Sequence, residues 1–175
     1  MKIVRDSRVG SAATTALILV LLAGNGWFLT TVMARLGYLT LPAALGLPAG
    51  LPGLRFWPLG EVGVLLTIGE SVAALVFVAV IAAWIGGTVT RHVDARPLRL
   101  FGSAVAAAIV AGVTAGAIRL VVTSFIQSTG PGVYLGYVAA VTVITAIWGL
   151  LAGILIGAVT ASVGSRRPIE VIDEA

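Results

Sequence analysis

The chain consists of long runs of apolar residues separated by short polar or proline-rich connections. A helix that crosses a bilayer needs about 20 mainly apolar residues, and four runs reach that length. Because helices and closed barrels are the structures that span membranes, we expect transmembrane helices at about 12–34, 62–85, 100–127 and 133–163. The sequence therefore predicts an all-α, polytopic membrane protein in which residues 1–175 form a single four-helix transmembrane bundle.

The connections predict how these helices are joined. Residues 86–99 form a short polar connection between the second and third helices. Residues 128–132 contain glycine and proline, which are typical of turns. We therefore expect the third and fourth helices to form a tight antiparallel hairpin, followed by a short tail at 164–175.

Lysine and arginine collect at one end of the predicted bundle, and in membrane proteins these residues accumulate on the cytoplasmic side. Arg35 and Arg55 lie in the connection at the opposite end. We therefore predict that both the N-terminus and the C-terminus are cytoplasmic. The basic residues at the predicted cytoplasmic end are Lys2, Arg5, Arg8, Arg91, Arg96, Arg99, Arg166 and Arg167.

Composition narrows the protein class. The chain is 59% hydrophobic and 10% charged, which is too apolar for the surface of a soluble domain of this size. It contains no cysteine, so disulfides, thiolate metal sites and cysteine nucleophiles are excluded. Lys2 is the single lysine among 11 basic residues, a bias typical of GC-rich bacterial genes, and we expect a bacterial plasma (inner) membrane location. The basic start also resembles a signal peptide, but the apolar run that follows is too long for one.

Two opposite charges lie inside the predicted helices. Glu70 lies in the second helix and Arg119 in the third, each eight residues from the same end of its helix. At 1.5 Å per residue both are about 12 Å from that end, so they are level. Since a partner of opposite charge lowers the cost of an ionisable group in lipid, we predict an intramembrane Glu70–Arg119 ion pair. Nearby hydroxyls, those of Thr67, Ser71, Thr123, Thr142 and Thr145, and main-chain carbonyls are candidate partners for the remaining guanidinium hydrogens.

Three roles are compatible with this pair. It can be a structural device that fixes the register of otherwise similar helices. It can be a transport or channel site in which Glu70 exchanges a proton while Arg119 changes partner. Alternatively, Arg119 can recognise an anionic lipid.

Small residues recur at helical spacing in the third and fourth helices. Such stripes let helix backbones approach closely in membranes. The third-helix stripe leads to Arg119, which indicates that Arg119 faces protein. The fourth-helix stripe is typical of a glycine zipper and packs either against the third helix or against a second copy of the chain. The residues are Ala108, Gly112 and Gly116 in the third helix and Gly149, Gly153 and Gly157 in the fourth.

The connection at 36–61 is rich in proline and leucine. Proline breaks helices, so a fifth spanning helix is not expected here. The connection is nevertheless too apolar to float in water. It either lies on the membrane surface or caps its own bundle, or it forms a docking surface for another membrane subunit. The candidate contact residues are Tyr38, Pro42, Pro48, Pro52, Phe56 and Trp57.

Catalytic chemistry has no visible residue set in the sequence. His92 is the single histidine and lies in a polar connection, so we predict no metal site, no catalytic residues and no cofactor. The basic residues adjoin helix ends, where membrane topology and anionic headgroups account for them, and nucleic acid is not an expected partner. Membrane lipids, other integral membrane subunits or a second copy of the chain are the expected partners.

These features predict a non-enzymatic accessory or assembly subunit of a larger bacterial inner-membrane complex, of the respiratory, transport or cell-envelope type. The absence of a catalytic set, the small-residue stripes and the apolar loop support this prediction. The alternative is a small oligomeric transporter or channel that uses the Glu70–Arg119 pair.

Overall fold

The computed structural model describes residues 6–25, 31, 35, 50–55, 63–92, 95–127 and 131–164. Most of them lie in four α-helices: α1 (Ser7–Gly24), α4 (Gly63–Arg91), α5 (Pro97–Gln127) and α6 (Pro131–Gly164). Each helix contains a stretch that is long and apolar enough to cross a bilayer, and no strand occurs in the described part of the chain. The prediction of an all-α protein with four candidate spanning helices is therefore confirmed, and the chain is described below as a multi-pass membrane protein.

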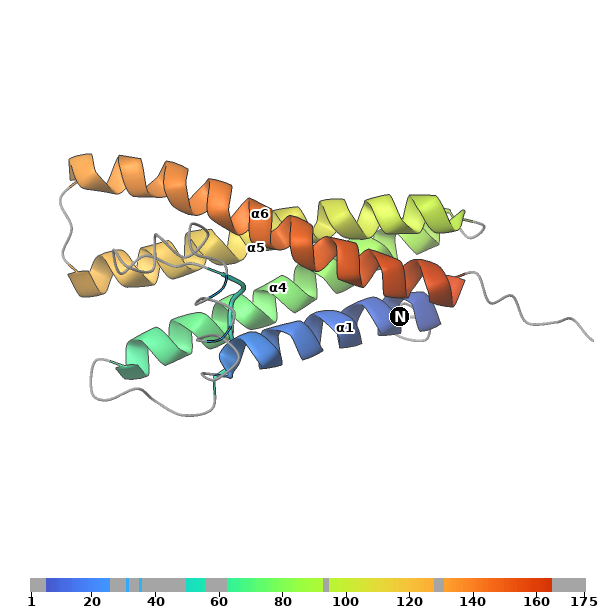
Figure 1. Cartoon of the computed structure of the whole chain (residues 1–175), viewed down its shortest axis with the longest axis horizontal. Coiled ribbons are helices and arrows are strands. Elements are labelled where there is room, and N and C mark those ends of the chain that lie inside the picture. Colours follow the sequence, from blue (N-terminus) through green and yellow to red (C-terminus); the bar gives the residue numbers. More distant parts are fainter. Residues whose placement is uncertain are drawn as a thin grey trace, which may run out of the picture.

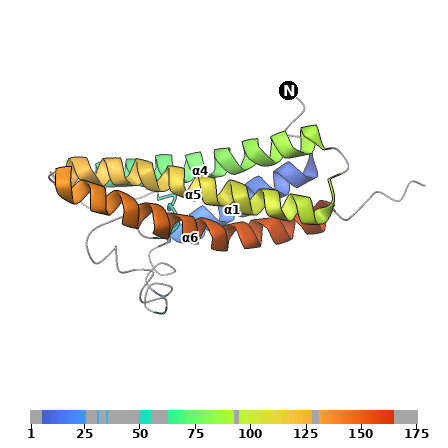
Figure 2. The same cartoon turned by 90° about the horizontal axis from the view of Figure 1, so that it is seen from above.

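The helices lie side by side and alternate in direction along the bundle (Figure 1; Figure 2). α5 packs against α4 and α6, and α1 packs against the same two helices. Gly164 lies against Leu100 and near the aliphatic part of Arg8. A Cβ atom placed on Gly164 would lie 2.8 Å from Leu100 Cδ1. The start of α1, the end of α6 and the α4–α5 connection therefore share one end of the bundle. We call it the terminal end, and the opposite end the loop end.

Small side chains fill much of the centre of the bundle. Alanine contributes little volume, so the helix backbones approach closely where alanines face one another. The largest fully buried apolar side chains, among them Phe77, Ile81 and Ile156, complete the packing. Large apolar side chains are also exposed on the outside of the bundle, as expected for helices that face lipid. The buried alanines are Ala12, Ala16, Ala23, Ala73, Ala74, Ala104, Ala107, Ala108, Ala111, Ala115 and Ala152.

Two helix ends differ from those predicted. The first helix was expected to continue to Ala34, but α1 ends at Gly24 and Asn25 adopts an extended conformation. Glycine and asparagine are poor helix formers, and another part of the chain packs against Gly24. The second helix was expected to end near residue 85, but α4 continues to Arg91. Gly86 is buried in this extension, and its packing offsets the low helix propensity of glycine.

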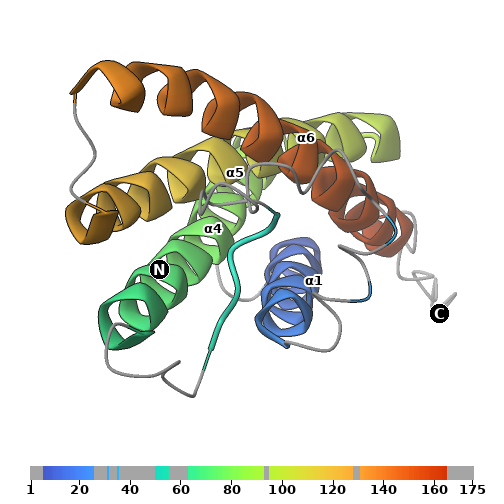
Figure 3. The same ribbon diagram turned by 60° about the vertical axis from the view of Figure 1, so that its left-hand side comes forward.

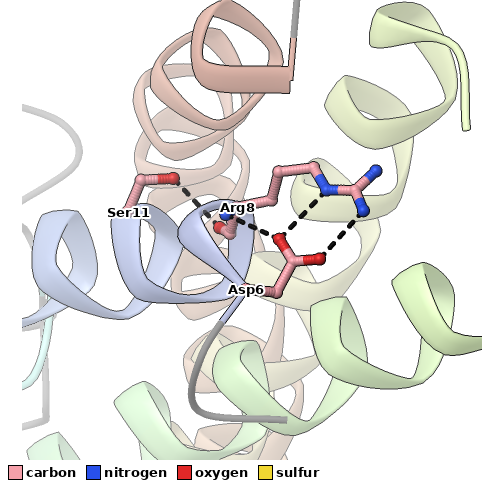
Figure 4. Close-up of polar contacts among 3 residues, drawn as sticks. All are labelled: Asp6, Arg8 and Ser11. Atoms are coloured by element: carbon pink, nitrogen blue, oxygen red, sulfur yellow. Dashed lines mark hydrogen bonds and ion pairs between the residues drawn. The ribbon is translucent and has the colours of Figure 1, made fainter. Parts of the chain in front are cut away.

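The start of α1 is fixed by a local ion pair. The Asp6 carboxylate accepts hydrogen bonds from the backbone N–H of Arg8 at 2.9 Å and from two nitrogens of the Arg8 side chain (Figure 4). Asp6 is thus the N-cap of α1, a position that aspartate favours because its oxygen satisfies a free N–H of the first turn. These bonds to Arg8 lower the pKa of Asp6 below its ordinary value.

Candidate functional site

The structure brings Glu70 of α4 and Arg119 of α5 together. Arg119 Nε donates a hydrogen bond to Glu70 Oε1 at 2.6 Å. The Arg119 side chain is 8% exposed and the Glu70 side chain 12% exposed, so both charges are largely removed from solvent. Glu70 is seven residues from the start of α4 and Arg119 eight residues from the end of α5, about 10 and 12 Å from the loop end. The two side chains therefore meet well inside the bundle, at the same level.

The pair also holds a separate piece of the chain. Residues 50–55, here called the inserted segment, belong to the long connection between α1 and α4. Arg119 Nη1 donates to the carbonyl oxygen of Gly50 at 2.9 Å. The backbone N–H of Gly53 donates to Glu70 Oε2 at 3.2 Å. Both carboxylate oxygens and two guanidinium nitrogens are therefore engaged, and each member of the pair fixes one point of the inserted segment.

The inserted segment lies among the helices and does not run over their surface. In Figure 3 it passes between α4 and α1. The N–H of Leu54 donates to the carbonyl oxygen of Val20 in α1 at 2.9 Å. A Cβ added to Gly53 would lie 2.8 Å from the Cα of Gly24, and a Cβ added to Gly24 would collide with the Leu54 carbonyl. The segment crosses the last turn of α1 so closely that only glycine fits on both sides.

The same segment reaches α4 and α6. The Ser71 hydroxyl of α4 donates to the carbonyl oxygen of Arg55 at 3.3 Å. At the other end of the segment, Gly50 faces the ring of Trp148 in α6. A Cβ atom placed on Gly50 would lie 3.9 Å from the Cε2 atom of this ring. Leu51 and Leu54 pack against the apolar core. Six residues of non-helical chain thus contact all four helices.

Polar backbone inside a membrane bundle must find partners within the protein. In the inserted segment the carbonyl groups of Gly50 and Arg55 accept hydrogen bonds, and the N–H groups of Gly53 and Leu54 donate them. Pro52 is buried and has no N–H to satisfy. The charges of the Glu70–Arg119 pair therefore satisfy each other and also provide two of these backbone partners. Chemically, the arrangement binds a stretch of the protein's own main chain.

The remaining guanidinium hydrogens were expected to bond hydroxyls or carbonyls, and two of the candidate hydroxyls are engaged within their own helices. Thr123 donates to the Arg119 carbonyl of its own helix at 2.8 Å, and Thr145 donates to the Val141 carbonyl at 2.7 Å. Both are bonds from a hydroxyl to the preceding helical turn, which satisfy a buried hydroxyl without a second helix. The acceptor that Arg119 Nη1 finds is a carbonyl, that of Gly50.

The small-residue stripes of the third and fourth helices face each other along α5 and α6. An added Cβ on Gly149 would lie 2.5 Å from the Ala108 carbonyl oxygen, and one on Gly112 would lie 2.6 Å from the Thr145 carbonyl oxygen. Gly116 lies against the Thr145 side chain. Gly153 and Gly157 lie against Val105 and Phe101 of α5 in the same way. In the chain as described, these stripes line a contact within one molecule.

Most of the predicted loop contact residues lie outside the described residues. These are Tyr38, Pro42, Pro48, Phe56 and Trp57. Pro52 is described, and it is buried within the inserted segment. Residues 50–55 pack against the helices of their own bundle, and the contact of this connection with a partner subunit stays a prediction.

Gly50 and Gly53 were not predicted as site residues. Their polar groups are main-chain atoms, which leave no chemical signature in a sequence. Two weak signals were present: a Gly-Leu-Pro-Gly sequence in an apolar connection, and an intramembrane charge pair with unused hydrogen-bonding capacity. Gly50 has φ of 87°, in the left-handed region that favours glycine.

Two buried side-chain donors, one in the inserted segment and one on α6, have no hydrogen-bond partner. They are Arg55 Nε and Trp148 Nε1. Within the described ranges, no group of three histidine, aspartate or glutamate residues is arranged to hold a metal ion. Comparison with protein-family models, with curated proteins and with solved structures finds no match to this chain.

Proposed function

We propose that this protein is a non-enzymatic accessory or assembly subunit of a larger bacterial inner-membrane complex of the respiratory, transport or cell-envelope type. The observation that carries the proposal is that the Glu70–Arg119 pair binds the protein's own inserted segment. Both charges hold the inserted segment against the helices, so the intramembrane charge pair has a structural role. A structural role for the pair favours a protein that acts by contacting other proteins through its surface.

The proposed orientation places the terminal end in the cytoplasm. Arg8, Arg91, Arg96 and Arg99 lie at or near this end, where anionic headgroups and the insertion machinery favour positive charge. The loop end then faces outward and presents the connection between α1 and α4. We propose that Phe56 and Trp57, beside the inserted segment in sequence, contact a partner subunit there.

Affinity purification in mild detergent tests the subunit proposal. The tagged chain should retain a stoichiometric integral membrane partner. A variant with Phe56→Ala and Trp57→Ala should lose it. Trp84→Ala is the matched control, because Trp84 is an aromatic residue 43% exposed on α4, far from the loop end. Recovery of the chain alone or as a homo-oligomer, in every preparation, would contradict the proposal.

A small oligomeric transporter or channel is the second candidate. It is favoured by the non-helical backbone of the inserted segment at the level of the charge pair. In transporters, interrupted backbone at this depth forms substrate and ion sites. In this mechanism, protonation of Glu70 weakens its bonds to Arg119 and Gly53 and allows the segment to move.

Flux measurements separate the two candidates. Purified protein in liposomes that contain a pH-sensitive dye should show pH-dependent flux if the transport mechanism holds. Glu70→Gln should abolish this flux, and Glu61→Gln, which removes the carboxylate nine residues earlier in the sequence, should preserve it. If the wild-type protein gives no flux above empty liposomes, the transport candidate fails and the subunit proposal is unaffected.

A further inference from the structure

Arg55 is the last residue of the inserted segment and carries a buried donor without a partner. Its Nε is shielded from solvent, and no residue accepts a hydrogen bond from it. A buried hydrogen-bond donor of a charged group is costly to leave unsatisfied, and an anionic acceptor gives the strongest compensation. The side chain therefore has the chemistry of an anion ligand.

The protein's own described carboxylates are already engaged. Glu70 uses Oε1 for Arg119 and Oε2 for the Gly53 N–H. Asp6 is paired with Arg8 at the terminal end of the bundle. The group formed by Glu70, Arg119 and Arg55 thus carries one net positive charge. That charge belongs to Arg55, and it favours binding of an anion.

Depth places Arg55 near the lipid headgroups. Its carbonyl is bonded to Ser71, eight residues from the start of α4, or about 12 Å along the axis. α4 has 29 residues and is about 43 Å long, against roughly 30 Å of hydrocarbon, so a centred helix extends about 6 Å beyond each boundary. Ser71 then lies about 6 Å inside the hydrocarbon. From this depth a long arginine side chain reaches the phosphate level.

The surface of α4 beside Ser71 suits an acyl chain. Ile68 precedes Ser71 by one helical turn and Leu75 follows it by another, and they are 55% and 56% exposed. Val64 and Val72 extend this exposed apolar stripe. An anion bound by Arg55 therefore has a lipid-facing apolar surface next to it. A free phosphate ion would make no use of that surface.

We propose that Arg55 binds the phosphate of an anionic phospholipid whose acyl chain lies along the Ile68–Leu75 stripe of α4. The proposal rests on the membrane location of the protein, which it shares with the proposed function. It does not depend on any partner subunit. It assigns Arg55 a ligand that lies outside the Glu70–Arg119 pair.

Native mass spectrometry of the purified protein in detergent tests this site. The probes are phosphatidylglycerol, diacylglycerol and inorganic phosphate. Phosphatidylglycerol should bind, whereas the other two should bind at least about tenfold more weakly, because each lacks one half of the interaction. Arg55→Gln should weaken phosphatidylglycerol binding by about tenfold or more.

Two further variants keep the test decisive. Arg55→Lys preserves the charge without the Nε donor, and it should bind phosphatidylglycerol with intermediate affinity. Arg35→Gln is the matched control, since it removes one exposed arginine from the same connection, and it should leave the affinity unchanged. Equal losses in Arg35→Gln and Arg55→Gln would reduce the effect to general electrostatics and overturn the proposal.

Two further outcomes would overturn the lipid assignment. Inorganic phosphate binding as tightly as phosphatidylglycerol, with the same dependence on Arg55, would identify a free-anion site and overturn the lipid assignment. Undiminished phosphatidylglycerol binding in both Arg55 variants would overturn it as well. Because the purified chain is used without partners, none of these results decides whether the protein is a subunit of a larger complex.

Discussion

At the scale of single residues, the guanidinium of Arg119 serves two acceptors of different kinds. One is the carboxylate of Glu70 and the other is the main-chain carbonyl of Gly50. Glu70 in turn accepts from Arg119 and from the Gly53 N–H. A simple buried ion pair and a pair that also binds backbone respond differently to mutation, because only the second leaves main-chain groups unsatisfied when both charges are removed.

Variants of the pair test this difference. Glu70→Leu alone should destabilise the protein by about 3–5 kcal/mol, because it leaves the Arg119 charge buried without its partner. The double variant Glu70→Leu with Arg119→Leu should remain at least about 2 kcal/mol less stable than wild type, because Gly50 and Gly53 lose their bonds. The free energy of unfolding in mixed SDS micelles measures both. Full recovery of wild-type stability in the double variant would show that the two charges stabilise the protein only by compensating each other.

The Asp6 cap makes a second residue-level prediction. Bonding to Arg8 lowers the pKa of Asp6 below its ordinary value of 3.8. A lowered folded-state pKa stabilises the protein above the ordinary value, and this contribution is lost as pH falls through the folded-state pKa. Asp6→Asn should therefore cost about 0.5 kcal/mol at neutral pH and nothing at a pH below both values.

Unfolding of the Asp6→Asn protein at several pH values checks this dependence. Asp6→Ala is the useful comparison, because it removes the capping oxygen as well as the charge. It should cost about 1 kcal/mol, and part of that loss should persist in acid. A loss from Asp6→Asn that is constant with pH would contradict the assigned role of the charge.

At the residue level, sequence reasoning depended on groups whose side-chain chemistry is visible. Glu70 and Arg119 were placed level and on facing helices from their depth and from the small residues that share their faces, and the structure brings them into contact. Hydroxyls and carbonyls were both candidate further acceptors by the same reasoning. The carbonyl of Gly50 could not be chosen, because every residue has a carbonyl and its position depends on a long-range fold.

At the scale of elements, α5 and α6 form the closest helix contact. Gly149 lies against the Ala108 carbonyl, and Gly112 lies against the Thr145 carbonyl. Main-chain atoms meet without intervening side chains, so dispersion contacts between helices are made at short range. An added methyl group on these glycines would meet backbone, which cannot move aside as a flexible side chain can.

Two glycine substitutions in α6 should therefore have opposite effects. Gly149→Ala should destabilise the protein by about 1–3 kcal/mol, because the new methyl would lie 2.5 Å from the Ala108 oxygen. Gly136→Ala should be neutral or stabilising by up to about 1 kcal/mol, because nothing lies within 4 Å and alanine has the higher helix propensity. Thermal unfolding in detergent compares them, and equal losses would contradict the packing described.

Hydropathy located the four described helices, and its largest error was the end of the first one. The apolar run that begins α1 continues well beyond Gly24, so hydropathy gives no reason for the helix to stop there. The helix ends where Gly24 approaches Gly53 and the Leu54 carbonyl. That contact joins residues distant in sequence, so a local pattern could not reveal it. The Gly-Asn sequence at this point was the available signal.

At the scale of the whole molecule, the inserted segment connects α1 with α5, which are not one of the extensively packed helix pairs. α1 packs against α4 and α6, whereas Arg119 lies on α5. Through the segment, Val20 of α1 and Arg119 of α5 are joined by hydrogen bonds to Leu54 and Gly50. The loop end of the bundle is therefore held together by main chain as well as by helix packing.

The distribution of arginine over this architecture predicts which end faces the cytoplasm. His92, beside Arg91 at the terminal end, and Arg35, in the connection at the loop end, are both exposed. Because the chain has no cysteine, His92→Cys and Arg35→Cys each give a single reactive thiol. Arginine favours the cytoplasmic side, so a membrane-impermeant maleimide added to intact spheroplasts should label Arg35→Cys and spare His92→Cys.

Lysis should then make His92→Cys reactive, which controls for thiols that are simply buried. Labelling of both variants in intact spheroplasts would indicate mixed orientation, and the reversed pattern would place the loop end in the cytoplasm. A reversed pattern would also move Arg55 to the inner leaflet, where anionic lipids contribute a negative surface potential. Lipid binding by Arg55 in detergent would be unchanged in that case, so orientation and lipid recognition can be decided separately.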